Sequence, residues 1–347
     1  MTARFFLPLL ILVFMSAARA EKPHAEKLSA RPEARAFVEQ MQALHGFDAE
    51  ELLKRLDRLT PNDRVLKLIA PPASPTQRSW RRYRNRFLDA RRIEDGLAFW
   101  QENAVPLAQA RIIYGVPEEI MVAIIGIETL YGRNTGSFNT FAALATLAFL
   151  EPRRAEYFLQ ELEQLLLLAR EQERDPESYT GSYAGALGLP QFMPGSLRRY
   201  AVNFDQDDFI DLSASTADAI GSVAHFLAQH GWQENAPIAL PVEAAQVTPR
   251  LLQEWMDAGI RPSLNPTVLF EAGLKPAPVP EMPDAPTPEM PDAPVTFVDL
   301  VTPDAPTEYW LGHENFYVIT RYNRSSFYAM AVHQLAEALA RRRRHEP

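Results

Sequence analysis

The stretch MVAIIGIETLYGRNTG, residues 121–136, places a single carboxylate, Glu128, at the end of an almost unbroken apolar run. No polar side chain occurs in its first seven residues, and a helix that is apolar on every side is a buried helix. Glycines at positions 132 and 136 then allow the chain to leave the helix sharply. The pattern predicts a buried helix over residues 117–131 that presents Glu128 near its end, towards a loop.

A carboxylate in an apolar run is unfavourable, because desolvation disfavours its charged form and raises its pKa. A Glu that stays protonated in an apolar pocket is suited to act as a general acid. The other explanation is a structural ion pair, for example between Glu128 and Arg133, five residues later. The residues of this stretch alone leave both explanations open.

The composition is that of a globular protein with ample material for a core: 347 residues, 47% hydrophobic and 23% charged. The net charge of −9 makes a dedicated nucleic-acid binder a poor interpretation. The chain has no cysteine, which rules out a disulfide framework, a thiolate metal site, a cysteine nucleophile and a cysteine that could carry a lipid.

The N-terminus has the three parts of a secretory signal peptide over residues 1–20. Arg4 supplies the positive charge, residues 5–15 are apolar, and Ala18-Arg19-Ala20 fits the small-residue rule for cleavage. We therefore expect a mature start near Glu21 and a periplasmic location, with an uncleaved anchor as the alternative. No later segment reaches eighteen unbroken apolar residues, so we expect no transmembrane segment after cleavage.

The rest of the chain predicts a mainly α protein with a smaller β-rich part, an α+β fold. Helical patterns run through most of residues 31–235 and return at the C-terminus. From about residue 236, four short runs rich in β-branched and aromatic residues predict strands: IALPVEA (238–244), TVLFEA (267–272), VTFVDLV (295–301) and NFYVITRY (315–322). The tandem repeat PEMPDAPT–PEMPDAPV, residues 280–295, predicts an extended surface insertion, with a binding motif as the alternative.

Two further features near the middle of the chain are typical of ligand sites. Arg153 and Arg154 lie at the start of a predicted helix, where the helix dipole disfavours cations. They indicate either an anionic ligand or a solvated helix start. The loop GSYAGALGLPQFMPGS, residues 181–196, offers backbone donors, the Gln191 amide and apolar surface, a mixture that suits sugars. An ordinary turn between two helices is the alternative.

Several segments in the same order resemble the lytic murein transglycosylase B family. They are RSWRRYRNRFL, IGIETLYGRNTGSFNTFAALATLAF with PRRAEYF, GSYAGALGLPQFMPGSLRRYAVNFD, and NFYVITRYNRSSFYAMAV. The resemblance covers roughly residues 35–235 and 308–340. It implies a lysozyme-like catalytic core over 116–235. A helical lobe over 21–115, completed by a C-terminal helix at 326–347, and a β-rich lobe over 236–325 with a Pro-rich insertion at 275–295 would flank this core.

The resemblance also implies an activity on peptidoglycan. The family cleaves the β-1,4 bond between N-acetylmuramic acid and N-acetylglucosamine and leaves 1,6-anhydromuramic ends, without a cofactor for catalysis. Glu128 would protonate the glycosidic oxygen and then take the proton from the muramic C6 hydroxyl, while the substrate's N-acetyl group holds the intermediate. A hydrolytic muramidase and a catalytically inactive peptidoglycan-binding protein remain as alternatives.

By the same resemblance, several residues are expected to bind the substrate. Ser182 and Gln191 would line the site beside Glu128, and Arg153 and Arg154 would lie near the peptide stem. Cleft residues from the flanking parts would be Tyr83, Tyr322, Asn323 and Tyr328. Ordinary core packing is the alternative for the aromatic ones. The chain departs from the family at Leu189-Pro190, where the family often has Tyr-Gly before the glutamine.

The family also carries an EF-hand-like calcium loop, and the corresponding stretch here is NFDQDDFIDLSASTAD, residues 203–218. Its expected ligands are Asn203, Asp205, Asp207, the Phe209 carbonyl and Asp218. Two departures from the family pattern count against calcium binding. Asp208 stands where the family has the turn glycine, and Asp218 lies one residue further along the chain than the closing acidic residue of the family. A structural calcium site and a solvated acidic loop both stay open at this point.

Overall fold

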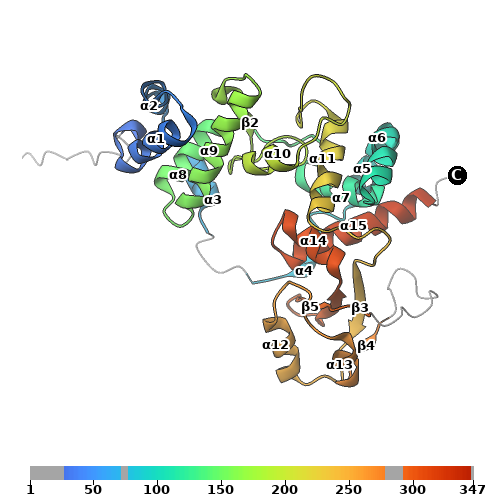
Figure 1. Ribbon diagram of the computed structural model, residues 1–347. Coiled ribbons are helices and arrows are strands. Elements are labelled where there is room, and N and C mark those ends of the chain that lie inside the picture. The colour runs from blue at the N-terminus through green and yellow to red at the C-terminus, as the bar shows by residue number, and fades with distance from the viewer. Residues whose placement is uncertain (1–26, 72–76, 278–291, 345–347) are drawn as a thin grey trace, which may run out of the picture. The chain divides into compact units, whose positions relative to one another are not determined.

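The fold is described from a computed structural model over residues 27–71, 77–277 and 292–344 (Figure 1). The expected signal peptide at 1–20 and most of the Pro-rich repeat lie outside the described residues. The chain divides into two compact units between Pro61 and Asn62. This division falls inside the helical lobe that the sequence predicts over residues 21–115.

The first unit is a small helical one. It consists of a short 3-10 helix, η1 (Leu28–Ala30), and two α-helices, α1 (Pro32–His45) and α2 (Ala49–Arg58). Gly46 ends α1 in the left-handed conformation, and the Asp48 side chain caps α2 by accepting a hydrogen bond from the Glu51 amide at 3.0 Å.

The second unit begins with a helical region centred on α7. Nine of the twelve residues of α7 are buried, as an all-apolar sequence requires. A two-stranded antiparallel sheet pairs β1 (Phe138–Asn139) with β2 (Thr180–Gly181). The helices of this region are α3 (Asp63–Ile69), α4 (Trp80–Arg84), α5 (Ala90–Glu102), α6 (Ala104–Tyr114), α7 (Glu118–Thr129), α8 (Thr140–Leu150), α9 (Ala155–Glu171), η2 (Pro176–Ser178), α10 (Pro194–Tyr200) and α11 (Thr216–Gln229).

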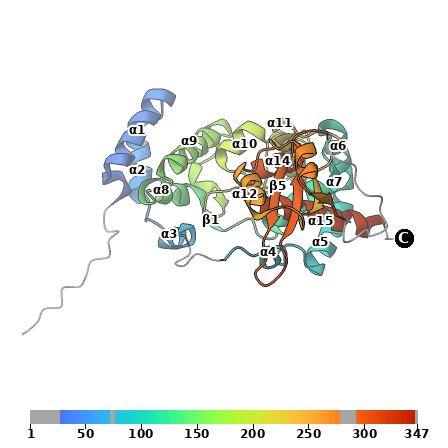
Figure 2. The same cartoon turned by 90° about the horizontal axis from the view of Figure 1, so that it is seen from below.

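The C-terminal helix α15 (Ser326–Arg344) returns to this region and packs along α7 and α5 (Figures 1 and 2). Its first residues are nearly all buried, including Tyr328 at 2% exposure. The preceding helix α14 (Glu314–Tyr322) packs on α15. The last two helices therefore bring residues from the end of the chain to the end of α7, about 200 positions earlier in the sequence.

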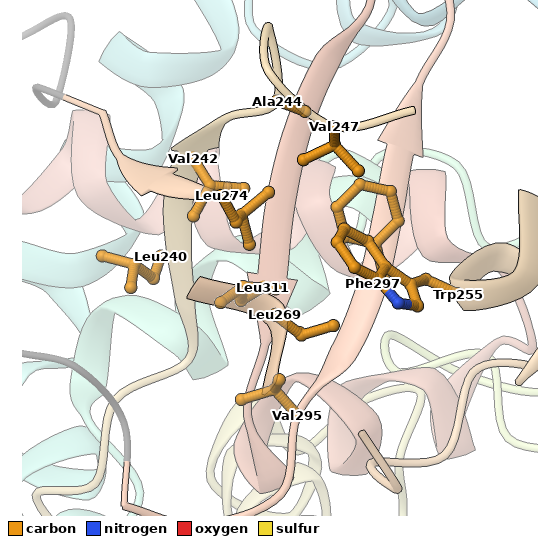
Figure 3. Close-up of a cluster of buried hydrophobic side chains, with 10 residues drawn as sticks. All are labelled: Leu240, Val242, Ala244, Val247, Trp255, Leu269, Leu274, Val295, Phe297 and Leu311. Atoms are coloured by element: carbon orange, nitrogen blue, oxygen red, sulfur yellow. The ribbon is translucent and has the colours of Figure 1, made fainter. Parts of the chain in front are cut away.

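A four-stranded antiparallel sheet forms the β-rich part, in the order β4-β3-β6-β5. Its strands are β3 (Ala239–Glu243), β4 (Lys275–Pro276), β5 (Thr296–Leu300) and β6 (Glu308–Gly312). Two helices, α12 (Pro249–Asp257) and α13 (Pro266–Glu271), cover an apolar core in which Trp255 meets Phe297 edge-on at 5.4 Å (Figure 3). The α+β fold class is confirmed.

Two of the four predicted strands are wrong. TVLFEA forms α13, because Pro266 opens a helix whose cap, the Asn265 side chain, accepts a hydrogen bond from the Thr267 amide at 3.0 Å. NFYVITRY forms most of α14, where its aromatic and β-branched residues pack on α15. Strand propensity of this kind reflects the packing environment more than the backbone, so a helical neighbour overrides it. The strand β6, EYWLG, was not predicted.

None of the helices in the described part of the chain is long and apolar enough to span a membrane.

Candidate active site

The turn that ends α7 is the most constrained piece of backbone in the region. Leu130 and Tyr131 both have positive φ, at 52° and 59°, a conformation that costs an L-residue about 1–2 kcal/mol. Gly132 continues it with a φ of 85°. Non-glycine residues hold such angles only when their surroundings fix them, and such strain clusters at functional sites. The predicted sharp exit is therefore confirmed, although it starts at two residues that are not glycines.

Glu128 lies in the last turn of α7, half-buried, with its carboxylate held by one hydroxyl group. Tyr328 of α15 donates a hydrogen bond from its hydroxyl to Glu128 Oε1 at 2.6 Å. Burial raises the pKa of Glu128 to about 7, and the Tyr328 hydrogen bond, which favours the charged form, opposes this rise. Near neutral pH the group therefore exists in both protonation states, as a residue that first gives and then takes a proton requires.

Two more tyrosines complete an aromatic wall around this carboxylate. Tyr322 stacks on Tyr328 with ring centroids 6.3 Å apart and planes 12° apart. Burial, and next the charge of Glu128, raise the pKa values of Tyr322 and Tyr83, so both lie within the electrostatic reach of Glu128. The structure thus gathers Tyr83, Tyr322 and Tyr328 at Glu128 from three separate helices.

Gln191 is held in a tight loop next to this cluster. Its φ is 53°, and its side-chain amide donates hydrogen bonds to the Thr135 carbonyl at 3.1 Å and the Gly188 carbonyl at 3.0 Å. The Tyr322 hydroxyl donates to the neighbouring Pro190 carbonyl at 2.5 Å. Because both amide hydrogens face the backbone, the carbonyl oxygen of Gln191 is the atom oriented to accept from a ligand.

Ser182 is ordered by the loop that it begins. Its Oγ accepts a hydrogen bond from the Ala186 amide at 3.0 Å, and its own amide donates to the Ala186 carbonyl at 2.8 Å. A hydroxyl that accepts in this way keeps its hydrogen for donation. Gly136 packs directly on Gly181 and Ser182, which places Ser182 against the loop that follows Glu128.

The two arginines lie elsewhere, at the start of α9, as predicted. Arg153 binds the carboxylate of Glu151 with Nε and Nη2, at 2.7 and 3.0 Å, and this contact lowers the pKa of Glu151. The guanidinium of Arg154, the N-cap residue, lies over the rings of Tyr157 and Phe158, at 4.7 and 4.9 Å. Both arginines are exposed, so the pair remains accessible to an anionic ligand.

Asn323 caps the C-terminal end of α14 directly after Tyr322 and is exposed. Its carbonyl accepts a hydrogen bond from the Ser325 amide at 2.7 Å, which shapes the short turn into α15. The alternative partner for Glu128, Arg133, instead forms two bonds with Asp95 of α5, at 2.5 and 2.8 Å. That structural explanation of Glu128 is therefore wrong.

The acidic loop after α10 folds on itself. Asp205 accepts hydrogen bonds from the Asp207 amide and the Ser215 hydroxyl, and Asp207 accepts one from the Phe209 amide at 2.7 Å. The side-chain amide of Asn203 donates to the Asp207 carbonyl. These are local turns in which the acidic side chains bind backbone and hydroxyl donors of their own loop.

Asp218, the expected closing ligand of a calcium site, is fully buried in α11. Its Oδ1 accepts from the amides of Phe204 and Asp205, at 2.6 and 3.4 Å, and its Oδ2 accepts from the amide of Asp211 at 2.9 Å. Among the described residues, no group of three or more His, Cys, Asp or Glu side chains is placed to hold a metal ion. As they lie here, the residues of this loop do not form a cage that fits calcium.

Thr129 is a member of the site that the sequence did not reveal. Its hydroxyl donates to the Leu189 carbonyl at 2.9 Å and accepts from the Gly132 amide at 3.0 Å. It therefore joins the end of α7 to the loop that carries Gln191. The sequence did offer one signal for this role: Thr129 is a second polar residue, directly after Glu128, at the end of an apolar run.

Chemically, the arrangement is a single carboxyl group with a raised pKa, bound by the hydroxyl of Tyr328. Among the described residues, no second carboxylate shifts the pKa of Glu128. Glycosidases that use two carboxylates place them roughly 5–10 Å apart on either side of the bond that they cleave. In a site with one such group, the substrate or a water molecule would supply the second function.

Tyr328→Phe removes only the hydroxyl that binds Glu128, and we expect it to raise the pKa of Glu128 further. The hydrogen bond favours the carboxylate, so its loss favours the protonated form. The pH profile of turnover should then keep its shape while its alkaline limb moves to higher pH. Tyr179→Phe, which removes a hydroxyl bound to Gln172, is the matched control and should leave the limb in place. An unmoved limb in Tyr328→Phe would show that this bond does not tune the acid.

Comparison with known proteins identifies the family of this chain. The family described as "Transglycosylase SLT domain" matches residues 29–337, and the chain belongs to this family. The membrane-bound lytic murein transglycosylase B of Escherichia coli is 41% identical over 320 residues, which cover 89% of this chain and 83% of that protein.

Solved structures are similar along most of their length. The soluble lytic transglycosylase SltB1 from Pseudomonas aeruginosa is 43% identical with a TM-score of 0.79, over 90% of this chain and 99% of that one. The Escherichia coli lytic transglycosylase Slt35, solved in complex with calcium, is 38% identical with a TM-score of 0.77, over 91% of this chain and 95% of that one.

Proposed function

We propose that the protein is a peptidoglycan lytic transglycosylase in which Glu128 is the only catalytic carboxylate. The observation that carries this proposal is the half-buried Glu128 with a pKa of about 7, bound to Tyr328, with no second carboxylate acting on it among the described residues. The proposed substrate bond is the β-1,4 bond between N-acetylmuramic acid and N-acetylglucosamine.

The reaction uses Glu128 twice. In the first step its proton passes to the glycosidic oxygen, the bond from that oxygen to C1 of the muramic sugar breaks, and the N-acetyl oxygen of the same sugar bonds to C1. In the second step the Glu128 carboxylate takes the proton of the C6 hydroxyl, whose oxygen displaces the N-acetyl oxygen at C1. The product is a 1,6-anhydro ring, water takes no part, and Glu128 ends in its starting protonation state.

The neighbouring polar groups suit the positioning of such a sugar. Gln191 presents a carbonyl oxygen that can accept from an N-acetyl N–H or a hydroxyl, and Ser182 presents a hydroxyl that can donate. Tyr83, Tyr322 and Asn323 contribute cleft surface, and the exposed Arg153 and Arg154 provide cations for the carboxylates of a peptide stem.

Mass spectrometry of muropeptides released from purified sacculi tests this function against its alternatives. A lytic transglycosylase leaves anhydromuramic ends that borohydride does not reduce. Reducing muramic ends would identify a hydrolytic muramidase. Binding to sacculi without any release would identify an inactive peptidoglycan-binding protein.

For location and partners, we infer an exported, periplasmic protein whose signal peptide is cleaved near Ala20. The small-residue cleavage motif and the absence of a cysteine that could carry a lipid support this inference. Peptidoglycan is the proposed partner, and the net charge of −9 argues against nucleic acid as another. Catalysis by Glu128 is proposed to need no cofactor.

For the acidic loop, we propose that Asp218 takes the organising role that a cation has in an EF hand. Its carboxylate accepts three backbone amides from the loop, and hydrogen bonds to a charged group are each worth about 1.5–3 kcal/mol. Slt35 was solved with calcium, and a bound calcium ion remains the competing expectation for this chain.

Asp218→Asn should therefore lower the stability of the protein by about 2–3 kcal/mol, because an amide nitrogen cannot accept a hydrogen bond and one loop amide loses its partner. Thermal unfolding with millimolar calcium or with a chelator is the measurement. The wild type should melt at the same temperature in both, and Asp218→Asn should melt lower in both. Asp208→Asn, an exposed neighbour, is the control. A rise of several degrees with calcium would restore the cation site.

A further inference from the structure

Helix α7 packs against α5, and Arg92 of α5 binds the last part of α7. Arg92 Nη1 donates a hydrogen bond to the Gly126 carbonyl at 2.6 Å. The same carbonyl accepts the backbone amide of Leu130, at 3.1 Å, in the turn that follows Glu128. The Arg92 side chain is 14% exposed, and its guanidinium lies over the ring of Phe87 at 5.2 Å. A cation at this position also suits the negative end of the helix dipole.

The turn itself folds back onto α5. The hydroxyl of Tyr131 donates to the Arg92 carbonyl at 3.0 Å. Its ring contacts Phe99, with centroids 5.4 Å apart, and fills the space above Gly96 and Gly126, where a Cβ atom would collide with it. Two glycines on facing helices thus allow Tyr131 to sit between α5 and α7.

Helix α5 also holds the residue that follows Gly132, because Arg133 donates two hydrogen bonds to Asp95 of α5, as described above. The positive φ angles of Leu130 and Tyr131 are unfavourable on their own, and these contacts with α5 help to hold the turn, together with the bond from the Gly132 amide to Thr129. Glu128 lies between Gly126, which Arg92 holds, and the strained turn.

We propose that Arg92 is a positioning residue for Glu128: it fixes the last turn of α7 so that the carboxylate meets the Tyr328 hydroxyl. This inference rests on the proposed function of Glu128. The groups that face Glu128 are Tyr83 from α4, Tyr322 from α14 and Tyr328 from α15, and Arg92 itself faces Asp89 at 3.7 Å. Arg92 acts on Glu128 through the backbone, because its guanidinium binds the Gly126 carbonyl, while burial and the Tyr328 hydrogen bond determine the pKa of Glu128.

The test is the kinetics of sacculus digestion by the purified protein in four forms: wild type, Arg92→Met, Arg92→Lys and Arg91→Met. Small displacements at a reacting group are costly, so we expect Arg92→Met to lose about tenfold or more in kcat. Arg92→Lys, which keeps a cation and a donor, should recover part of this loss. Arg91 is the matched control, because it is the exposed neighbour of Arg92 on α5 and makes only a long ion-pair contact with Asp95, at 3.8 Å. Arg91→Met should behave as wild type.

Two further readouts separate positioning from mere stabilisation. Sedimentation with sacculi, in the Glu128→Gln background, should show unchanged binding when Arg92→Met is added. The alkaline limb of the pH profile should move upward in Arg92→Met, as in Tyr328→Phe, because both loosen the same hydrogen bond. The double variant should show no more movement than Tyr328→Phe alone.

Arg92→Met with wild-type kcat and an unmoved limb would overturn the proposal, even if its melting temperature fell. A double variant whose limb moves by the sum of the single shifts would overturn it too. Should Arg92→Met fail to fold, Arg92→Gln takes its place, since it too removes the guanidinium that binds the Gly126 carbonyl. In that variant, a shift of the alkaline limb of the pH profile to higher pH supports the proposal, and an unmoved limb overturns it. A wild-type protein that releases no fragments would instead overturn the proposed function, and this role with it.

Discussion

Glu128→Gln should abolish the release of fragments from purified sacculi, with a loss of about 10²–10⁴-fold or more in turnover, while the protein stays folded. The amide has the shape of the carboxylic acid and can still accept the hydrogen bond from Tyr328. It has no proton to give to a glycosidic oxygen and cannot take one from a hydroxyl. The measurement is muropeptide release quantified by mass spectrometry, with the fold checked by circular dichroism.

The same variant should be more stable than the wild type in alkaline solution. The folded-state pKa of Glu128 is about 7, above the ordinary value of 4.5 for a glutamate, so folding favours its protonated form. The wild type therefore loses stability as pH rises from about 4.5 through 7, whereas the amide does not titrate. The melting temperatures should agree near pH 4 and separate above pH 7, with Glu128→Gln the higher.

Glu161→Gln is the matched control for this pair of results. Glu161 is also buried in a helix, burial raises its pKa, and it accepts a hydrogen bond from the Gly195 amide at 2.8 Å. It should gain stability in alkaline solution as Glu128→Gln does, yet keep its activity. Retained cleavage in Glu128→Gln, or equal losses in the two variants, would contradict the catalytic assignment.

Gly136→Ala should have the largest effect on stability among single-methyl additions near the site, roughly 3 kcal/mol or more. The φ of Gly136 is 94°, and an added Cβ would overlap the Gly181 carbonyl and lie 2.6 Å from the Ser182 nitrogen. These are backbone atoms, which cannot turn aside as a flexible side chain can. Because Ser182 moves with them, activity should fall as well.

Gly231→Ala separates the two causes of this effect. Gly231 has an almost identical φ of 96°, but an added Cβ would meet nothing within 4 Å. It should therefore show only the conformational cost, about 1 kcal/mol, with full activity. Thermal unfolding and sacculus digestion of both variants are the measurements. Equal destabilisation would mean that the contact with Gly181 does not matter.

The buried helix and its carboxylate were predictable because both depend on local sequence. An apolar run fixes burial whatever surrounds it, and burial alone predicts the direction of the pKa shift of Glu128. The resemblance supplied Tyr328, but not its hydrogen bond, since 200 positions separate the two residues. Pairing over such a distance depends on how α15 returns to α7.

Other features could not be predicted from the sequence, because they also depend on contacts between distant segments of the chain. NFYVITRY is a strand by local propensity and a helix in the fold, because its apolar side chains pack on α15. Arg133 was a reasonable partner for Glu128 by position, but the strained turn carries it to Asp95 on α5. The sequence left a calcium site and a solvated acidic loop open, and it did not reveal that the Asp218 carboxylate accepts hydrogen bonds from three backbone amides of that loop.

The most direct test of the central claim, that Glu128 and the substrate alone complete the cleavage, is digestion of sacculi in water enriched in oxygen-18. Mass spectrometry of the new muramic ends then reports whether solvent oxygen has entered the product. We predict anhydromuramic ends that contain no heavy oxygen. Heavy oxygen at C1 of reducing ends would contradict the account, because it would show that water attacks where the C6 hydroxyl is expected to.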